Sequence, residues 1–135
     1  MKKKIGIYHY QYYRGACKIC YRHFIQEMVE SYEKCHETAE AIYGKENCEF
    51  LHYTDFGQYD SDNTDRPNFH RIMEAIEKKE LDVVMCCTLN NITVNEALLI
   101  QFYKYVRSQG MEFLTAEHGL DAMKYIDIYI EKNHL

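Results

Sequence analysis

The sequence predicts an α/β fold with three layers, in which helices cover both faces of a mainly parallel central sheet. Four short apolar stretches with strand character alternate along the chain with four stretches whose apolar residues recur at helical spacing. Strands that alternate with helices are joined by crossover connections, which make neighbouring strands parallel. The 135 residues are enough for one core. We therefore expect residues 1–135 to form a single domain.

The N-terminal third is expected to hold the first strand and a long helix. Residues 4–10 (KIGIYHY) predict the strand, and residues 11–15 predict a polar loop after it. In the segment that follows, apolar residues recur at helical spacing as far as Gly44. Glycine is a typical helix-ending residue, so we expect the helix to stop there.

The middle of the chain predicts a second strand and a second helix. Residues 48–53 alternate between polar and apolar side chains, as a strand does. A polar loop is expected at residues 55–65, before Pro67. Proline fits the first turn of a helix, where its missing N–H costs nothing. The apolar face of that helix is formed by Phe69, Ile72, Met73 and Ile76.

The remaining elements follow the same alternation. Residues 81–87 are apolar almost throughout, which predicts a central strand covered on both faces. Thr93 and Glu96 have the spacing of a capping box that opens a third helix, and Gly110 fits its end. Residues 111–114 predict the fourth strand. The expected core residues of the third helix are Leu98, Phe102, Tyr105 and Val106, and those of the last helix are Met123, Ile126 and Ile130.

The fold predicts where a ligand would bind. In open α/β sheets, ligands bind beyond the carboxyl ends of the strands. Three loops are expected at that edge, at residues 11–15, 54–65 and 88–93. Candidate functional residues are therefore sought in these loops.

Composition sets limits on location and partners. The net charge is −5, whereas autonomous DNA binders usually carry a basic footprint. No apolar run approaches the ~18–20 residues that span a membrane, and no signal-peptide core follows the N-terminal lysines. We expect a cytoplasmic protein whose six cysteines are mostly reduced, with no membrane association and with weak or indirect DNA binding.

Three blocks of the sequence resemble the catalytic domain of the serine recombinases, the resolvase/invertase family. They are residues 8–12 (YHYQY), residues 55–69 with Asp55, Gly57 and the Arg66-Pro67 pair, and the apolar run 81–87 with residues 89–94 after it. The resemblance extends from about residue 5 to about residue 120. It implies the resolvase catalytic-domain fold. It also implies a reaction in which a serine hydroxyl attacks a DNA phosphodiester while arginines bind the phosphate.

The residues that the resemblance assigns to this chemistry are mostly replaced. Carried over residue by residue, the nucleophile becomes Tyr12, and the arginine of the first strand becomes Tyr10. The acidic residue and two arginines of the third block become Asn90, Asn91 and Val94. The resemblance therefore implies an inactive homologue that acts by binding. The alternative is recombinase-type phosphoryl transfer with Tyr12 as an altered nucleophile.

Arg66 is the one family arginine that remains, and two interpretations of it stay open. It could belong to a residual anion pocket at the start of the second helix, together with Tyr12, Arg71 and Arg14. It could instead lie on a solvated face and pair with Asp62 or Asp65.

A CxxC sequence at Cys17 and Cys20 gives a second alternative function, thiol–redox chemistry at a helix N-terminus. The competing interpretation is two thiols one turn apart, with one facing the core. A zinc site that adds Cys35 and His36 is excluded if the helix is unbroken, because Cys20 and Cys35 would then lie ~22 Å apart. We expect no metal and no cofactor.

The apolar stripe of the last helix indicates the kind of partner that we expect. Full-length members of the family continue through a dimer-forming helix into a DNA-binding domain, and we expect no such C-terminal domain after residue 135. The apolar stripe of the last helix can cover either its own sheet or a partner. An exposed stripe would favour a homodimer, and a recombinase or another protein is the alternative partner.

Overall fold

The computed structural model describes residues 2–12, 18–57, 66–93 and 95–135. Its centre is a four-stranded sheet with the strand order β2-β1-β3-β4, in which every pairing is parallel. The strands are β1 (Lys3–Tyr12), β2 (Cys48–Gly57), β3 (Val83–Cys86) and β4 (Glu112–Thr115). The predicted parallel sheet is confirmed.

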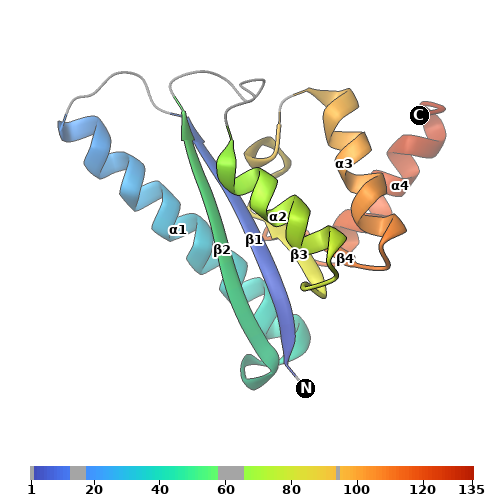
Figure 1. Ribbon diagram of the computed structural model, residues 1–135, viewed down its shortest axis with the longest axis horizontal. Coiled ribbons are helices and arrows are strands. Elements are labelled where there is room, and N and C mark those ends of the chain that lie inside the picture. The colour runs from blue at the N-terminus through green and yellow to red at the C-terminus, as the bar shows by residue number, and fades with distance from the viewer. Residues whose placement is uncertain (1, 13–17, 58–65, 94) are drawn as a thin grey trace.

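Helices lie on both sides of this sheet, as the alternation predicts (Figure 1). One face is covered by α1 (Lys18–Tyr43). The other is covered by α2 (Pro67–Glu77), α3 (Glu96–Ser108) and α4 (Asp121–Lys132). Two short 3-10 turns, η1 (Lys45–Asn47) and η2 (Leu89–Asn91), precede β2 and follow β3. The three-layer arrangement is confirmed. Within the described residues, no helix is both long enough and apolar enough to cross a membrane.

Alternation along β1 divides the core into two clusters. Ile5 and Ile7 pack with α1, whereas Tyr8 and Tyr10 pack with the helices of the opposite layer. Successive strand residues point to opposite faces, so this division follows from the sequence order. Gly6 lies between the two isoleucines, where a Cβ atom would come within 2.6 Å of the Leu81 side chain.

Two predicted loops begin later than expected, because β1 and β2 pair along ten residues. Gln11 pairs with Phe56 and Tyr12 with Gly57, so these residues belong to strands. Asp55 is a strand residue as well, and it is buried. Polar residues continue these strands because their side chains find hydrogen-bond partners, which local polarity does not reveal.

The predicted capping box at the start of α3 is wrong. Asn95 is the N-cap, and its side chain accepts a hydrogen bond from the Leu98 backbone N–H. Thr93 instead accepts a hydrogen bond from the Asn95 backbone N–H. Leu98 is 48% exposed and does not join the core, contrary to the prediction. The buried residues of α3 are Ile100, Phe102, Tyr103 and Val106.

The predicted ends of the first and third helices are confirmed, whereas the strand predicted at 81–87 is shorter and covers Val83–Cys86. Gly44 and Gly110 follow α1 and α3 with φ values of 93° and 77°, a conformation that glycine adopts without strain. All four residues of β3 are buried, as expected of a strand covered on both faces. Ile72 and Ile76 of α2 are buried on the predicted apolar face.

Candidate functional site at the carboxyl edge of the sheet

The carboxyl ends of β1 and β2 lie beside the start of α2 and the turn η2 (Figure 1). This is the edge at which the fold predicts ligand binding. Several of the predicted site residues lie outside the described residues, namely Arg14, Cys17 and Val94, as do Asp62 and Asp65. Tyr12 and Cys20 are described in backbone only.

Asp55 holds the start of α2 in place from the neighbouring strand. Its carboxylate accepts hydrogen bonds from the backbone N–H groups of Asn68 and Phe69, at 3.0 and 2.9 Å. It also accepts one from the Tyr8 hydroxyl at 2.9 Å. The residue at the N-cap position, Arg66, makes no side-chain cap, so Asp55 provides the acceptor that the helix N-terminus needs. Sequence analysis placed Asp55 in a loop and missed this role.

Arg66 is turned into the protein and does not lie on a solvated face. It is 6% exposed, and its guanidinium carbon lies 4.0 Å from the centroid of the Tyr10 ring. The guanidinium also donates a hydrogen bond to the backbone carbonyl of Ile92, in the segment after β3. Arg66 therefore connects the start of α2 to β1 and to the η2 segment, by a cation–π contact and a hydrogen bond.

The Tyr8 hydroxyl lies within the same buried network. Burial raises the pKa of Tyr8, and the neighbouring Asp55 carboxylate raises it further, whereas Arg66 opposes both effects. Tyr8 therefore stays protonated and donates to Asp55. A phenol held in this state serves as a hydrogen-bond donor rather than as a nucleophile.

Asn91 stabilises the turn after β3. Its side-chain oxygen accepts a hydrogen bond of 3.1 Å from the Thr88 backbone N–H, which forms a capping box around η2. Its side-chain nitrogen lies 3.5 Å from the backbone oxygen of Tyr10. Asn90 is exposed and lines a pocket of about 420 Å³ between η2 and the start of α4. An aspartate or arginine at position 91 could not reproduce both amide contacts.

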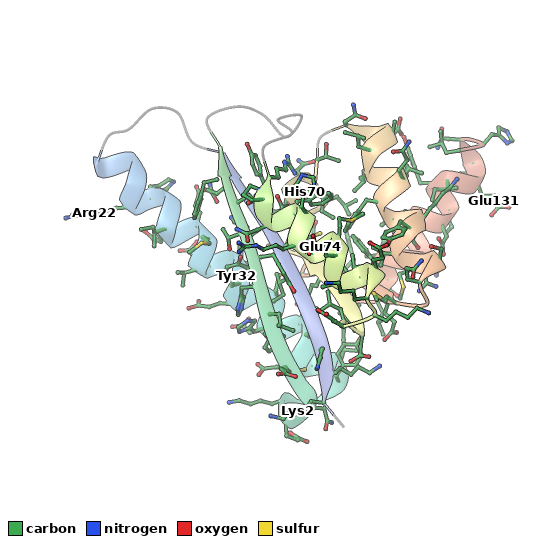
Figure 2. All side chains as sticks on the ribbon, viewed as in Figure 1. Lys2, Arg22, Tyr32, His70, Glu74 and Glu131 are labelled. Carbon is green, nitrogen blue, oxygen red and sulfur yellow. The ribbon has the colours of Figure 1, made fainter. Side chains whose placement is uncertain are left out.

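The residues proposed for an anion pocket separate into two environments. Arg66 is buried, whereas Arg71 is exposed and donates a hydrogen bond of 3.2 Å to the side-chain oxygen of Asn68. His70 is also exposed, on the part of α2 nearest the carboxyl edge (Figure 2). Tyr12 ends β1 opposite Gly57. Among described side chains, Arg66 and Arg71 therefore do not converge on one point.

The described residues contain no group of three or more His, Cys, Asp or Glu side chains placed to hold a metal ion. His36 was one of the residues considered for a zinc site. Its Nε2 atom lies 2.8 Å from the Nε2 atom of His52. Cys35 is buried on the inner face of α1. A thiol pair that sequence analysis did not select, Cys35 and Cys87, does come together in the structure.

The fold and the carboxyl-edge site define a three-layer α/β domain built like a recombinase catalytic domain. Sequence comparison identifies the family: the family described as resolvase, N-terminal domain, matches residues 22–130. The chain belongs to this family. The matched range contains Arg66, Asn90 and Asn91, whereas Tyr10 and Tyr12 precede it. A comparison with curated proteins finds no match.

Solved structures support the same fold. The chain is similar to the N-terminal catalytic domain of TP901-1 integrase, with 17% identity and a TM-score of 0.61, over 98% of this chain and 100% of that one. It is similar to the C-terminal catalytic domain of ISC1926 TnpA, an IS607-like serine recombinase, with 12% identity and a TM-score of 0.62, over 84% and 70% of the two chains. A resolvase family site-specific recombinase from Streptococcus pneumoniae matches with 20% identity and a TM-score of 0.56, over 98% and 93%.

Proposed function

We propose that this resolvase-family domain does not cleave DNA and acts by binding another protein. The observation that carries the proposal is the environment of Arg66. The one arginine that the resemblance retains is buried against the Tyr10 ring and donates to the Ile92 carbonyl. A guanidinium engaged in this way supports the fold, whereas a phosphate clamp needs cations that face the ligand.

The residues that replace the family's catalytic residues also support a role without DNA cleavage. Recombinase-type transfer needs an activated hydroxyl and several cations on the phosphate. Each such electrostatic contact is worth about 3–4 kcal/mol of barrier. Tyr10 packs in the core, and Asn91 caps a turn, so both positions now have structural contacts. Together these losses leave no strong stabilisation of a phosphoryl-transfer transition state.

The surface of α4 is the proposed binding site. Ile126 of the predicted stripe is buried, and Met123 and Ile130 pack against the core, so that stripe covers its own sheet. A second apolar set lies at i, i+3 and i+4 on the exposed side of the helix: Tyr125, Ile128 and Tyr129. We assign this set to a second copy of the chain, because the family resemblance implies a dimer-forming helix at this end. A recombinase subunit is the alternative partner.

The test of non-catalysis is incubation of the protein with supercoiled plasmid, followed by denaturing gels that detect nicks and covalent protein–DNA adducts. We expect neither product, at any divalent cation concentration. An active serine recombinase with its own site is the positive control. A covalent adduct that Tyr12→Phe abolishes would overturn the proposal and establish the altered nucleophile. An adduct that survives Tyr12→Phe would overturn it equally, through a different nucleophile.

A further inference from the structure

We propose that Cys87 is a site of thiol modification, at which its sulfur attacks a low-molecular-weight disulfide and Cys35 then closes an intramolecular disulfide. Cys87 directly follows β3 and is partly exposed. It lines a pocket of about 390 Å³ between α1 and the ends of β3 and β4. A small disulfide therefore has space beside the sulfur atom.

The fold brings the two thiols together on one face of the sheet. Cys87 continues the alternation of Val83 and Met85, which pack with α1, whereas Cys86 points to the opposite layer. On α1, the same spacing rule places Ser31, Cys35 and Thr38 on the side that faces the sheet. Figure 2 labels Tyr32, which follows Ser31 in the sequence, in this part of α1.

The contacts of Cys87 assign different roles to the two thiols. The neighbouring Cys35 thiol is the largest effect that lowers the pKa of Cys87, to about 6, and the Ser31 hydroxyl and the charge of Lys34 add to it. The Cys87 side chain, together with burial, in turn raises the pKa of Cys35. Cys87 is thus the thiolate nucleophile, and Cys35 keeps the proton until the second step.

Other groups near the Cys87 sulfur act on its pKa in the opposite direction. Burial and the Glu117 carboxylate raise the pKa of Cys87 against the effects above. The charged and titratable groups around it come from α1, from β3 and from the segment after β4: Lys34, Cys35, Glu37, Cys86 and Glu117.

Ser31 is positioned by a chain of hydrogen bonds that starts at the buried His9 ring and ends at the surface. Its hydroxyl lies 3.1 Å from Nδ1 of His9, whose Nε2 lies 2.7 Å from the side-chain oxygen of Gln11. The Gln11 amide donates to the Glu27 carboxylate at 2.7 Å, so its oxygen must accept from His9. Burial lowers the pKa of His9 and favours the neutral ring. Nδ1 then accepts from the Ser31 hydroxyl while Cys87 is a thiol, and the hydroxyl can rotate to donate to the Cys87 sulfur once the thiolate forms.

The reaction balances in two steps. The Cys87 thiolate attacks one sulfur of the small disulfide, forms a mixed disulfide and releases one thiolate, which takes up a proton. Cys35 then loses its proton and attacks the Cys87 sulfur, which expels the second small thiol. Two protein thiols are oxidised to one disulfide, and one small disulfide is reduced to two thiols.

The experiment treats the reduced protein with glutathione disulfide and maps the products by peptide mass spectrometry. The rate of iodoacetamide alkylation at each cysteine is measured separately across pH. We expect Cys87 to react roughly tenfold faster than Cys48 at pH 7, with a midpoint near its lowered pKa. Cys48 is a matched comparison, because it is partly buried and burial raises its pKa.

Substitutions at Cys35 and Ser31 test the roles of these two residues separately. The glutathione product of the wild type should be a Cys35–Cys87 crosslink, and Cys35→Ala should stop at the mixed disulfide on Cys87. Ser31→Ala, a change at a positioning residue, should move the alkylation midpoint of Cys87 upwards. A Cys17→Ser/Cys20→Ser background should leave all three results unchanged. Alkylation of Cys87 no faster than that of Cys48 would overturn the site, and a mixed disulfide that persists in the wild type would overturn the role of Cys35.

Discussion

At the scale of single residues, the carboxyl edge is organised by polar side chains that face inwards. Asp55 and Arg66 are both buried, and both are held by contacts to neighbouring elements. Buried charges are tolerated only when hydrogen bonds replace their hydration. These two residues belong to the part of the sequence that resembles the recombinases most closely, and the structure gives each a supporting role. A family motif can therefore persist because it builds the scaffold.

Asp55→Ala should destabilise the fold strongly. The substitution leaves two backbone N–H groups at the start of α2 and the Tyr8 hydroxyl without their acceptor. We expect a loss of at least about 2 kcal/mol in the free energy of unfolding, measured by urea denaturation. Asp55→Asn keeps one acceptor oxygen and should fall between the wild type and the alanine variant.

Asp82→Ala is the matched control for this substitution. Asp82 is exposed and accepts a single backbone hydrogen bond, from Lys4. We expect it to cost less than about 1 kcal/mol. Equal losses at the two positions would show that Asp55 does not cap α2.

At the scale of elements, the pairing of β1 with β2 decides more than local propensity does. The two strands run side by side for ten residues and carry polar side chains to the edge where function is expected. α1 spans 26 residues on one face, and its first turns lie away from the sheet in Figure 1. The inner side of α1 supplies the Cys35 and Ser31 side chains that approach Cys87. A long helix thus brings a thiol and a hydroxyl to the end of a strand far away in sequence.

Asn95→Ala should distinguish the observed cap of α3 from the capping box that the sequence suggests. Asn95 accepts the Leu98 N–H, so its loss should cost about 1 kcal/mol in unfolding free energy. Glu96→Ala removes the side-chain oxygen that a Thr93–Glu96 box needs, together with an exposed hydrogen bond from the Tyr129 hydroxyl. It should cost less than Asn95→Ala, because alanine improves the helix propensity of this exposed position. A larger loss of stability in the Glu96 variant than in Asn95→Ala would instead support the predicted capping box.

At the scale of the whole molecule, net charge and exposed apolar surface support the proposal that the domain binds protein. A net charge of −5 gives no general attraction to phosphate backbones. The three large exposed side chains on α4 instead form an apolar surface, and removing this surface from water on association is favourable. This combination supports association with protein more than with DNA.

Ile128→Glu should shift the protein from dimer to monomer. A glutamate in the middle of the α4 surface would have to be desolvated on association, which costs enough to weaken a small interface at least tenfold. Sedimentation velocity over a range of protein concentrations measures the shift. Val29→Glu is the control, because Val29 is similarly exposed but lies on α1. A wild type that stays monomeric, or equal effects of both variants, would contradict the assignment of the interface to α4.

Local patterns in the sequence were sufficient for the fold class and for most elements. The alternation of strands and helices, the apolar run at 81–87, and the helix ends at Gly44 and Gly110 depend on periodicity and on backbone freedom, which act over a few residues. The same patterns pointed to the carboxyl edge of the sheet, because parallel strands share that edge.

Only the tertiary structure decided what the polar residues at that edge do. Whether Arg66 is solvated, whether Asp55 caps α2, and whether Cys87 meets Cys35 all depend on contacts between residues distant in sequence. An isolated arginine, aspartate or cysteine has no periodicity that reveals its partner. Hydrogen bonding, burial and pKa are properties of an environment, and that environment forms only when α1, β1, β2 and β3 pack together.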